Sequence, residues 1–127
     1  MAAKAGPALK LSPKEKKAVR EFIRAVRLAY GDQIQRAALF GSKVRGDGTK
    51  YSDIDILLIV ADEKWKYRQP FSVILSDIAL KYDVEIDARV ISAARWQHMK
   101  DVQAGLYKNI SRDAVPIRFR KSVTSGD

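Results

Sequence analysis

The octapeptide DIDILLIV, from Asp53 to Val60, carries apolar side chains on both faces of an extended chain. Because alternate side chains of a strand point to opposite faces, Leu57 and Ile59 share one face with the two aspartates. The other face carries Ile54, Ile56, Leu58 and Val60. A strand that is apolar on both sides over most of its length is typically covered on both sides. We therefore predict that this segment is the central strand of a sheet.

Three other segments have helical spacing. The sequence SPKE, from Ser12 to Glu15, has the form of a capping box with proline in the first turn, so it predicts a helix that ends at Gly31-Asp32. Pro70 predicts the start of a second helix, and Ser92 is the expected N-cap of a last one. That single last helix is expected to carry Trp96, Met99, Leu106, Tyr107 and Ile110.

Two further strands complete the expected fold. Ile34 to Phe40 predicts a first strand, and the alternation from Val84 to Ile91 predicts a third. The resulting order is α-β-β-α-β-α, without an internal repeat. We expect an α/β (α+β) fold, a single compact domain in which a small mixed sheet of about three to four strands packs against helices. The domain is expected to span residues 12–117, with a flexible basic N-terminus (1–11) and a disordered tail (118–127).

Composition limits the classes of protein to consider. A chain of 127 residues has the size of one domain with one core. The absence of cysteine excludes disulfides and thiolate metal sites. The longest uninterrupted apolar run, Ile56 to Ala61, is far shorter than the ~20 residues of a membrane span, so we predict a cytoplasmic protein without a membrane partner.

The chain is strongly basic, with 24 Lys and Arg against 15 Asp and Glu and a formal charge of +9. Such a charge attracts polyanions, either nucleic acid or nucleotide phosphates. One face of the first predicted helix carries Lys16, Arg20, Arg24 and Arg27. Two interpretations remain open at this point, because a run of like charges on a helix can also be an ordinary solvated face.

Asp53 and Asp55 lie at the start of the central strand and point to the same side. Two like charges held together in a partly dry site are unfavourable unless a cation bridges them or one takes a proton. Hard divalent cations such as Mg²⁺ prefer oxygen ligands and share substrate phosphates. The pair therefore predicts half of a metal site.

The segment GSKVRG, from Gly41 to Gly46, directly follows the first predicted strand. Glycine lets the backbone approach a ligand closely, and Ser42 adds a hydroxyl donor. Lys43 and Arg45 add positive charge, with exposed side chains as the alternative, and Gly46 permits a tight return. A phosphate cradle opposite a carboxylate-bound metal is the minimum equipment for phosphoryl transfer.

The joint pattern is GS, three residues, G, five residues and SDxD, between two apolar strands. It resembles the signature of the polymerase-beta-like nucleotidyltransferase superfamily, in particular its minimal nucleotidyltransferase (MNT) branch. The matching residues are Gly41, Ser42, Gly46, Ser52, Asp53 and Asp55.

The resemblance implies a third metal-binding carboxylate on a neighbouring strand, after an apolar residue. Asp87, in IDARVIS, fits that place. Glu85 has the same facing and is the rival candidate. The structural alternative for both is solvent exposure or an ion pair with Arg89.

The resemblance also implies a reaction, in which a nucleoside monophosphate moves from an NTP, with ATP expected, to a hydroxyl while pyrophosphate leaves. Asp53 and Asp55 would ligate two Mg²⁺ ions, with Mn²⁺ as an alternative, and Asp87 would bind the metal that activates the acceptor. Gly41 and Ser42 would hold the β- and γ-phosphates. The other expected nucleotide-binding residues are Lys43, Arg45, Gly46 and Ser52.

Compact members of this branch often pair with a helical protein of the HEPN type, and some act as antitoxins by adenylylating it. The resemblance therefore implies a hydroxyl on a partner protein as a possible acceptor. A second hypothesis is a catalytically silent module that binds a partner protein or RNA through its basic helix. A third is an enzyme that tails nucleic acid, which the net charge permits.

Overall fold

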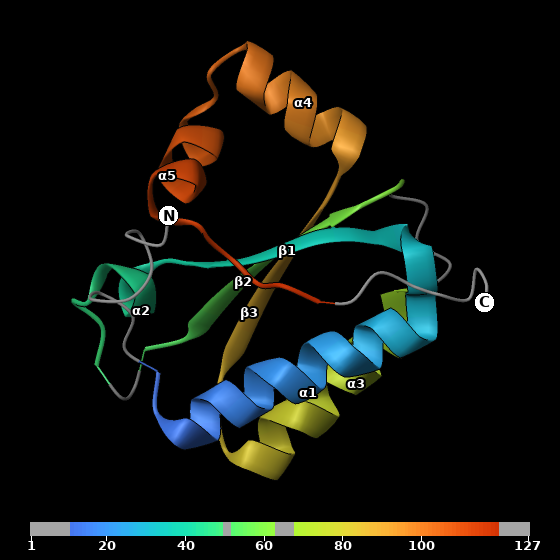
Figure 1. Ribbon diagram of the computed structural model, residues 1–127, viewed down its shortest axis with the longest axis vertical. Coiled ribbons are helices and arrows are strands. Elements are labelled where there is room, and N and C mark those ends of the chain that lie inside the picture. Colours follow the sequence, from blue (N-terminus) through green and yellow to red (C-terminus); the bar gives the residue numbers. More distant parts are fainter. Residues whose placement is uncertain (1–10, 50–51, 63–67, 120–127) are drawn as a thin grey trace.

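The computed structural model describes residues 11–49, 52–62 and 68–119 (Figure 1). The helices are α1 (Pro13–Tyr30), the 3₁₀ turn η2 (Gly31–Gln33), α2 (Ser42–Arg45), α3 (Arg68–Tyr82), α4 (Ala93–Asp101) and α5 (Gly105–Asp113). The strands are β1 (Ile34–Phe40), β2 (Ile54–Val60), β3 (Ile86–Ser92) and β4 (Val115–Pro116). No helix among these residues is both long and apolar enough to cross a membrane.

The strands form one mixed sheet in the order β3-β2-β1-β4. β1 pairs antiparallel with β2 and with β4, whereas β2 and β3 are parallel. A parallel pair needs a crossover connection, and α3 supplies it. β2 lies between β1 and β3, so the prediction of a central strand is confirmed, as is the α/β fold with a small mixed sheet.

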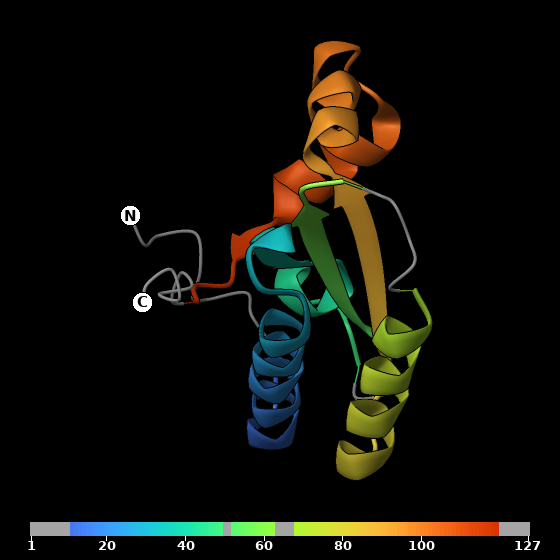
Figure 2. The same cartoon turned by 90° about the vertical axis from the view of Figure 1, so that its right-hand side faces the viewer.

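The two faces of the sheet are covered by different helices (Figure 1). On one face, Ile54, Ile56 and Leu58 are 0% exposed and pack in the core with α1 and α3. These two helices lie side by side, as Figure 2 shows, and the rings of Phe22 and Phe71 meet edge to face at 5.8 Å between centroids. The opposite face carries a smaller core under α4 and α5, which consists of Leu57, Ile59, Ile91, Met99 and Ile110.

Both predicted helix caps are confirmed. The Ser12 hydroxyl accepts the amide of Glu15 at 3.1 Å, and the Ser12 amide donates to Glu15 Oε1 at 2.9 Å, which completes the capping box. At the start of α4, the Ser92 hydroxyl accepts the amide of Arg95 at 3.1 Å. α1 ends at Tyr30, next to the predicted stop.

The prediction of one continuous last helix is wrong. Its residues form two helices, because Gln103 adopts the left-handed conformation (φ 53°) and reverses the chain after α4. The Ala104 amide donates to the Met99 carbonyl at 2.9 Å and closes this turn. The reversal brings Tyr107 of α5 against Trp96 of α4, with ring centroids 4.8 Å apart.

Several predicted boundaries shift by one or two residues. The third strand begins at Ile86 rather than at Val84, because Asp83 takes a positive φ (54°) and the Val84 amide still bonds the Ala79 carbonyl of α3. β2 begins at Ile54, one residue late, and α3 begins two residues before Pro70. β1 has the predicted bounds.

The predicted termini, 1–11 and 118–127, lie outside the described residues except for 11, 118 and 119. Within that described part, the guanidinium carbon of Arg27 lies 4.5 Å from the ring centroid of Phe119.

Candidate active site

Two of the predicted carboxylates meet across the parallel strands. Asp55, the second residue of β2, stands opposite Asp87 of β3 in the register, and Leu57 stands opposite Arg89. Since side chains alternate along a strand, Asp87 and Arg89 lie on the same side of β3. Asp55 is half-buried, whereas Asp87 and Arg89 are exposed. This end of the sheet therefore gathers charges on the face that α4 and α5 cover further along.

Glu85, the rival for the third carboxylate, lies one residue before β3 begins. Its carbonyl accepts the amide of Ile54 at 2.9 Å, and its side chain is exposed. The register therefore brings Asp87, not Glu85, opposite Asp55. Within the described ranges, Asp87 forms no ion pair with Arg89, but its side chain is exposed, which is the other half of that alternative.

Burial and two neighbouring carboxylates raise the pKa of Asp55. Burial is the largest cause, and the negative charges of Asp87 and Asp53 add to it. The positive charges of Arg89 and Arg45 offset part of this rise. The charges of Asp87 and Asp53 are thus close enough to Asp55 to disfavour its ionisation.

The residues present suit a hard divalent cation in their chemistry. Asp53, Asp55 and Asp87 supply oxygen donors, and a cation between them would relieve the repulsion that adds to the effect of burial on Asp55. Within the residues that the structure describes, no three acidic or histidine side chains converge as a preformed ligand cluster.

Gly41 brings the first loop against this carboxylate group. A Cβ atom at this position would lie only 2.0 Å from Asp55 Oδ2, and the backbone has a positive φ (85°). Any larger residue would therefore clash with the carboxylate and strain the backbone. The carboxylate of Asp55 lies directly against the backbone that precedes Ser42.

The loop from Gly41 to Gly48 is closed by its own backbone. The amides of Val44 and Arg45 donate to the Gly41 carbonyl at 3.1 and 3.0 Å. The amides of Gly46 and Gly48 donate to the Ser42 carbonyl at 2.9 and 3.1 Å. Gly46 is left-handed (φ 90°), so the predicted tight return is confirmed.

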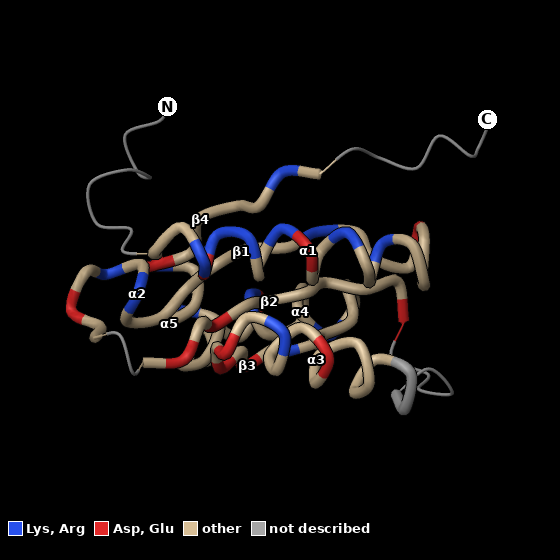
Figure 3. The backbone as a smooth tube through the Cα atoms, turned by 90° about the horizontal axis from the view of Figure 1, so that it is seen from below, with Lys and Arg blue, Asp and Glu red and all other residues tan. Residues whose placement is uncertain are grey.

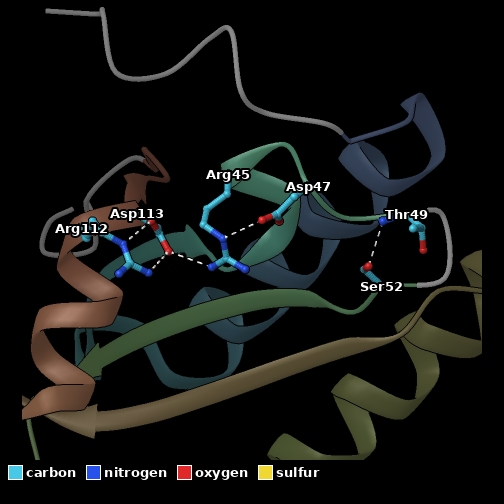
Figure 4. A network of polar contacts seen from close by, with 6 residues as sticks. All are labelled: Arg45, Asp47, Thr49, Ser52, Arg112 and Asp113. Atoms are coloured by element: carbon cyan, nitrogen blue, oxygen red, sulfur yellow. Dashed lines mark hydrogen bonds and ion pairs between the residues drawn. The ribbon is translucent and has the colours of Figure 1, made fainter.

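The two cations of the loop differ in their surroundings. Lys43 is 4% exposed, with Nζ 2.6 Å from Glu15 Oε2, so the alternative that it is an exposed cation is wrong. The side chain of Arg45 is 41% exposed. Its Nη1 lies 3.0 Å from Asp113 Oδ2 and its Nε lies 3.2 Å from Asp47 Oδ2 (Figure 4).

Ser52 closes the connection to β2. Its hydroxyl accepts the Thr49 amide at 2.9 Å, and its amide donates to the Thr49 carbonyl at 3.0 Å (Figure 4). Sequence reasoning missed Asp113 altogether and treated Glu15 only as a cap. Neither carries a local signal for its role, because Glu15 lies 28 residues from Lys43 and Asp113 lies 68 residues from Arg45.

The fold and this motif define a class of protein. The family model of the nucleotidyltransferase domain matches residues 19–114, which is most of the chain. The chain therefore belongs to the nucleotidyltransferase domain family, and the resemblance read from its motif is confirmed.

Two relatives come from Methanocaldococcus jannaschii. One, named "Putative protein adenylyltransferase MJ0604", is 38% identical over 96 residues, which cover 76% of this chain and 90% of that protein. The other, named "Putative protein adenylyltransferase MJ0141", is 36% identical over 69 residues, which cover 54% of this chain and 70% of that protein.

A solved structure shares the fold at low sequence identity. It is described as "Crystal structure of the toxin-antitoxin with AMP-PNP" and is 18% identical, with a TM-score of 0.50. The superposition covers 82% of this chain and 74% of that one.

Proposed function

We propose that this nucleotidyltransferase moves AMP from ATP to a hydroxyl acceptor and depends on a divalent cation. The observation that carries the proposal is the meeting of three segments at one end of the sheet. Asp55 lies against the backbone of Gly41 and stands opposite Asp87 in the register. A glycine-serine loop beside carboxylates is suited to phosphate on one side and to a cation on the other.

In the proposed reaction, the acceptor oxygen bonds to the α-phosphorus and the bond to pyrophosphate breaks. Mg²⁺, with Mn²⁺ as an alternative, would supply charge neutralisation and would be held by Asp53, Asp55 and Asp87. Asp87 would also receive the proton of the acceptor hydroxyl.

The remaining predicted residues would form the nucleotide site. Gly41 and Ser42 would contact the β- and γ-phosphates. Arg45, a partly exposed residue of the loop, would contact phosphate by its charge. Gly46 and Ser52 hold the backbone of the connection through their hydrogen bonds.

A protein hydroxyl is the acceptor we favour. The two relatives carry the name of protein adenylyltransferase, and the structure with the same fold is that of a toxin-antitoxin pair. We therefore propose an antitoxin-like role, in which a helical partner of the HEPN type receives the AMP. The cytoplasmic location stays a prediction.

The second candidate is a silent module that binds a partner or RNA through α1. Figure 3 shows blue positions repeating along α1, and Lys16, Arg20 and Arg24 are exposed. The acidic group on the other face of the sheet favours the enzyme, since a pure binder has no need of mutually repelling carboxylates. Binding of RNA, and tailing of nucleic acid, stay predictions and would require a steep loss of affinity with salt.

The test is calorimetric titration of Mg²⁺ with AMP-PNP into the wild type and into the Asp53→Asn/Asp55→Asn variant. We expect metal-dependent binding by the wild type alone, followed by transfer of label from α-³²P-ATP to a co-purifying protein. If the wild type fails to bind nucleotide, with or without a partner present, the proposal is wrong and α1 becomes the better candidate.

A further inference from the structure

Glu15 and Lys43 form a buried ion pair that joins the first turn of α1 to the loop from Gly41 to Gly48. Lys43 is 4% exposed and Glu15 is 9% exposed, and Nζ lies 2.6 Å from Oε2. Removing two charges from water is so unfavourable that a well-packed apolar pair is often equally stable or more stable. Stability alone is therefore a poor reason for this pair.

Both oxygens of Glu15 are engaged. Oε1 accepts the Ser12 amide at 2.9 Å while Oε2 accepts the ammonium of Lys43. Burial opposes ionisation of Glu15, but the hydrogen bonds from Lys43 and Ser12 outweigh it and lower its pKa. The carboxylate is thus fixed at both oxygens, and the helix start serves as the anchor for Lys43.

The anchor acts on a short and well-defined piece of backbone. Lys43 directly follows Ser42, and the next side chain, Val44, is buried in the core under α1 and α3. Glycines with positive φ stand on both sides, at Gly41 and Gly46. Between these two positions, three side chains tie the loop to the rest of the domain: Lys43 through Glu15, Val44 in the core, and the partly exposed Arg45 through Asp113.

We infer that Glu15 is a positioning residue of the nucleotide site: it holds Lys43 so that Gly41 and Ser42 keep their place beside Asp55. In this role Lys43 acts through its backbone and its buried side chain, and it does not contact phosphate. The inference rests on the proposed function for its effect on nucleotide, and on the contacts above for its effect on the loop.

Substitutions can separate the two roles of Glu15, which are to complete the capping box and to bind Lys43. Glu15→Gln keeps the capping box, in which glutamine serves as well as glutamate, but removes the anionic acceptor for Lys43. Lys43→Met keeps most of the alkyl chain and removes the charge. The double variant removes both charges, so neither is left buried and unpaired. Glu21→Gln is the matched control, because Glu21 lies on the same helix and bonds Lys81 at the surface.

The measurements are calorimetric affinity for Mg²⁺ with AMP-PNP, and unfolding in urea. We expect each single variant to weaken binding by ~10-fold or more, since small misplacement of a positioning group is amplified at the site. The double variant should bind nucleotide no more weakly than the single variants, because all three lose the same contact between Glu15 and Lys43. It should regain the stability that the singles lose, yet not the affinity. Glu21→Gln should bind as the wild type does.

Two results would overturn the inference. If Lys43 contacts phosphate directly, Glu15→Gln will bind as well as or better than the wild type. If the pair serves only stability, the double variant will recover affinity together with stability.

Failure of the proposed function is recognised separately. If the wild type binds no nucleotide, hydrogen exchange of the amides from Val44 to Gly48 still tests the anchor without any ligand. Faster exchange there in Glu15→Gln, but not in Glu21→Gln, supports the inference, and unchanged exchange overturns it.

Discussion

The two faces of β2 belong to the same seven residues but differ in what covers them. On the α1 and α3 face, the apolar side chains from Ile54 to Val60 are covered along the whole strand. On the other face, Leu57 and Ile59 are buried with residues of α4 and α5, whereas Asp55 is half-buried and stands opposite the exposed Asp87. The α1 and α3 face stabilises the fold, and the candidate site lies on the second face, where Asp55 stands opposite Asp87. The following variants test this division, since each should affect one side and spare the other.

Asp55→Asn should have the largest effect, and this effect should be on the candidate site rather than on the stability of the fold. We expect transfer to fall by more than ~100-fold, because loss of even an outer-shell partner of a metal ligand costs about 10–100-fold. Stability at neutral pH should stay equal or rise, because the raised pKa of Asp55 means that the folded state disfavours its charge. Transfer assays and urea unfolding check both parts. Retention of a tenth of the activity would contradict the assignment.

Leu58→Ala, on the face covered by α1 and α3, should lower stability and leave nucleotide binding unchanged. Leu58 is 0% exposed, and truncation of such a residue costs about 2–5 kcal/mol of unfolding free energy. Nucleotide affinity per folded molecule should not change. Leu58→Met, which nearly conserves volume, is the control and should cost less than about 1.5 kcal/mol. A loss of affinity in the folded fraction of Leu58→Ala would mean that the two faces are coupled.

The pH dependence of stability should separate Glu15 from Asp55. The pKa of Glu15 is lowered from its ordinary value of 4.5, so its stabilising contribution is complete above that value and is lost as pH falls through the folded pKa. The pKa of Asp55 is raised, so its destabilising contribution appears as pH rises. Unfolding in urea between pH 6 and 3 should show the advantage of wild type over Glu15→Gln shrinking below pH 4.5. An advantage that grows in acid would contradict the sign.

Asp113→Asn should have the smallest effect. Asp113 joins α5 to Arg45, and hydrogen bonds from Arg112 and Arg45 outweigh burial and lower its pKa. The side chain of Asp113 is only 8% exposed, but those of Arg45 and Arg112 are 41% and 62% exposed, so solvent screens both pairs. We therefore expect less than about 1 kcal/mol of lost stability. The measurement is urea unfolding at low and high salt, and the deficit should shrink with salt. A larger loss would show that the candidate site also depends on α5 for its fold.

The sequence predicted the features of the fold that depend on residues close together in the chain. The capping box at Ser12, the central strand and the glycine return at Gly46 each rest on a pattern within a few residues, and each is present. The break between α4 and α5 was not predictable in this way, because a glutamine at position 103 adopts a conformation usual for glycine.

The site followed the same rule. Strand alternation predicted the facing of Asp55, whereas Asp53 lies one residue before β2 begins. The choice of Asp87 over Glu85 as the partner opposite Asp55 depends on the register of two strands. The environment of Lys43 depends on Glu15 in a distant helix. Contacts of this kind are set by tertiary packing, and no local pattern encodes them.

The crossover through α3 separates Asp55 from Asp87 along the chain and unites them in space. In an unfolded or partly folded chain, Asp55 and Asp87 are therefore not adjacent. A ligand that contacts both residues binds only the native state. Such a ligand draws the folding equilibrium toward its own site, by about 2.7 kcal/mol when it is present at 100 times its dissociation constant. At a high concentration of nucleotide, the proposed substrate would thus also stabilise this small domain against unfolding and proteolysis.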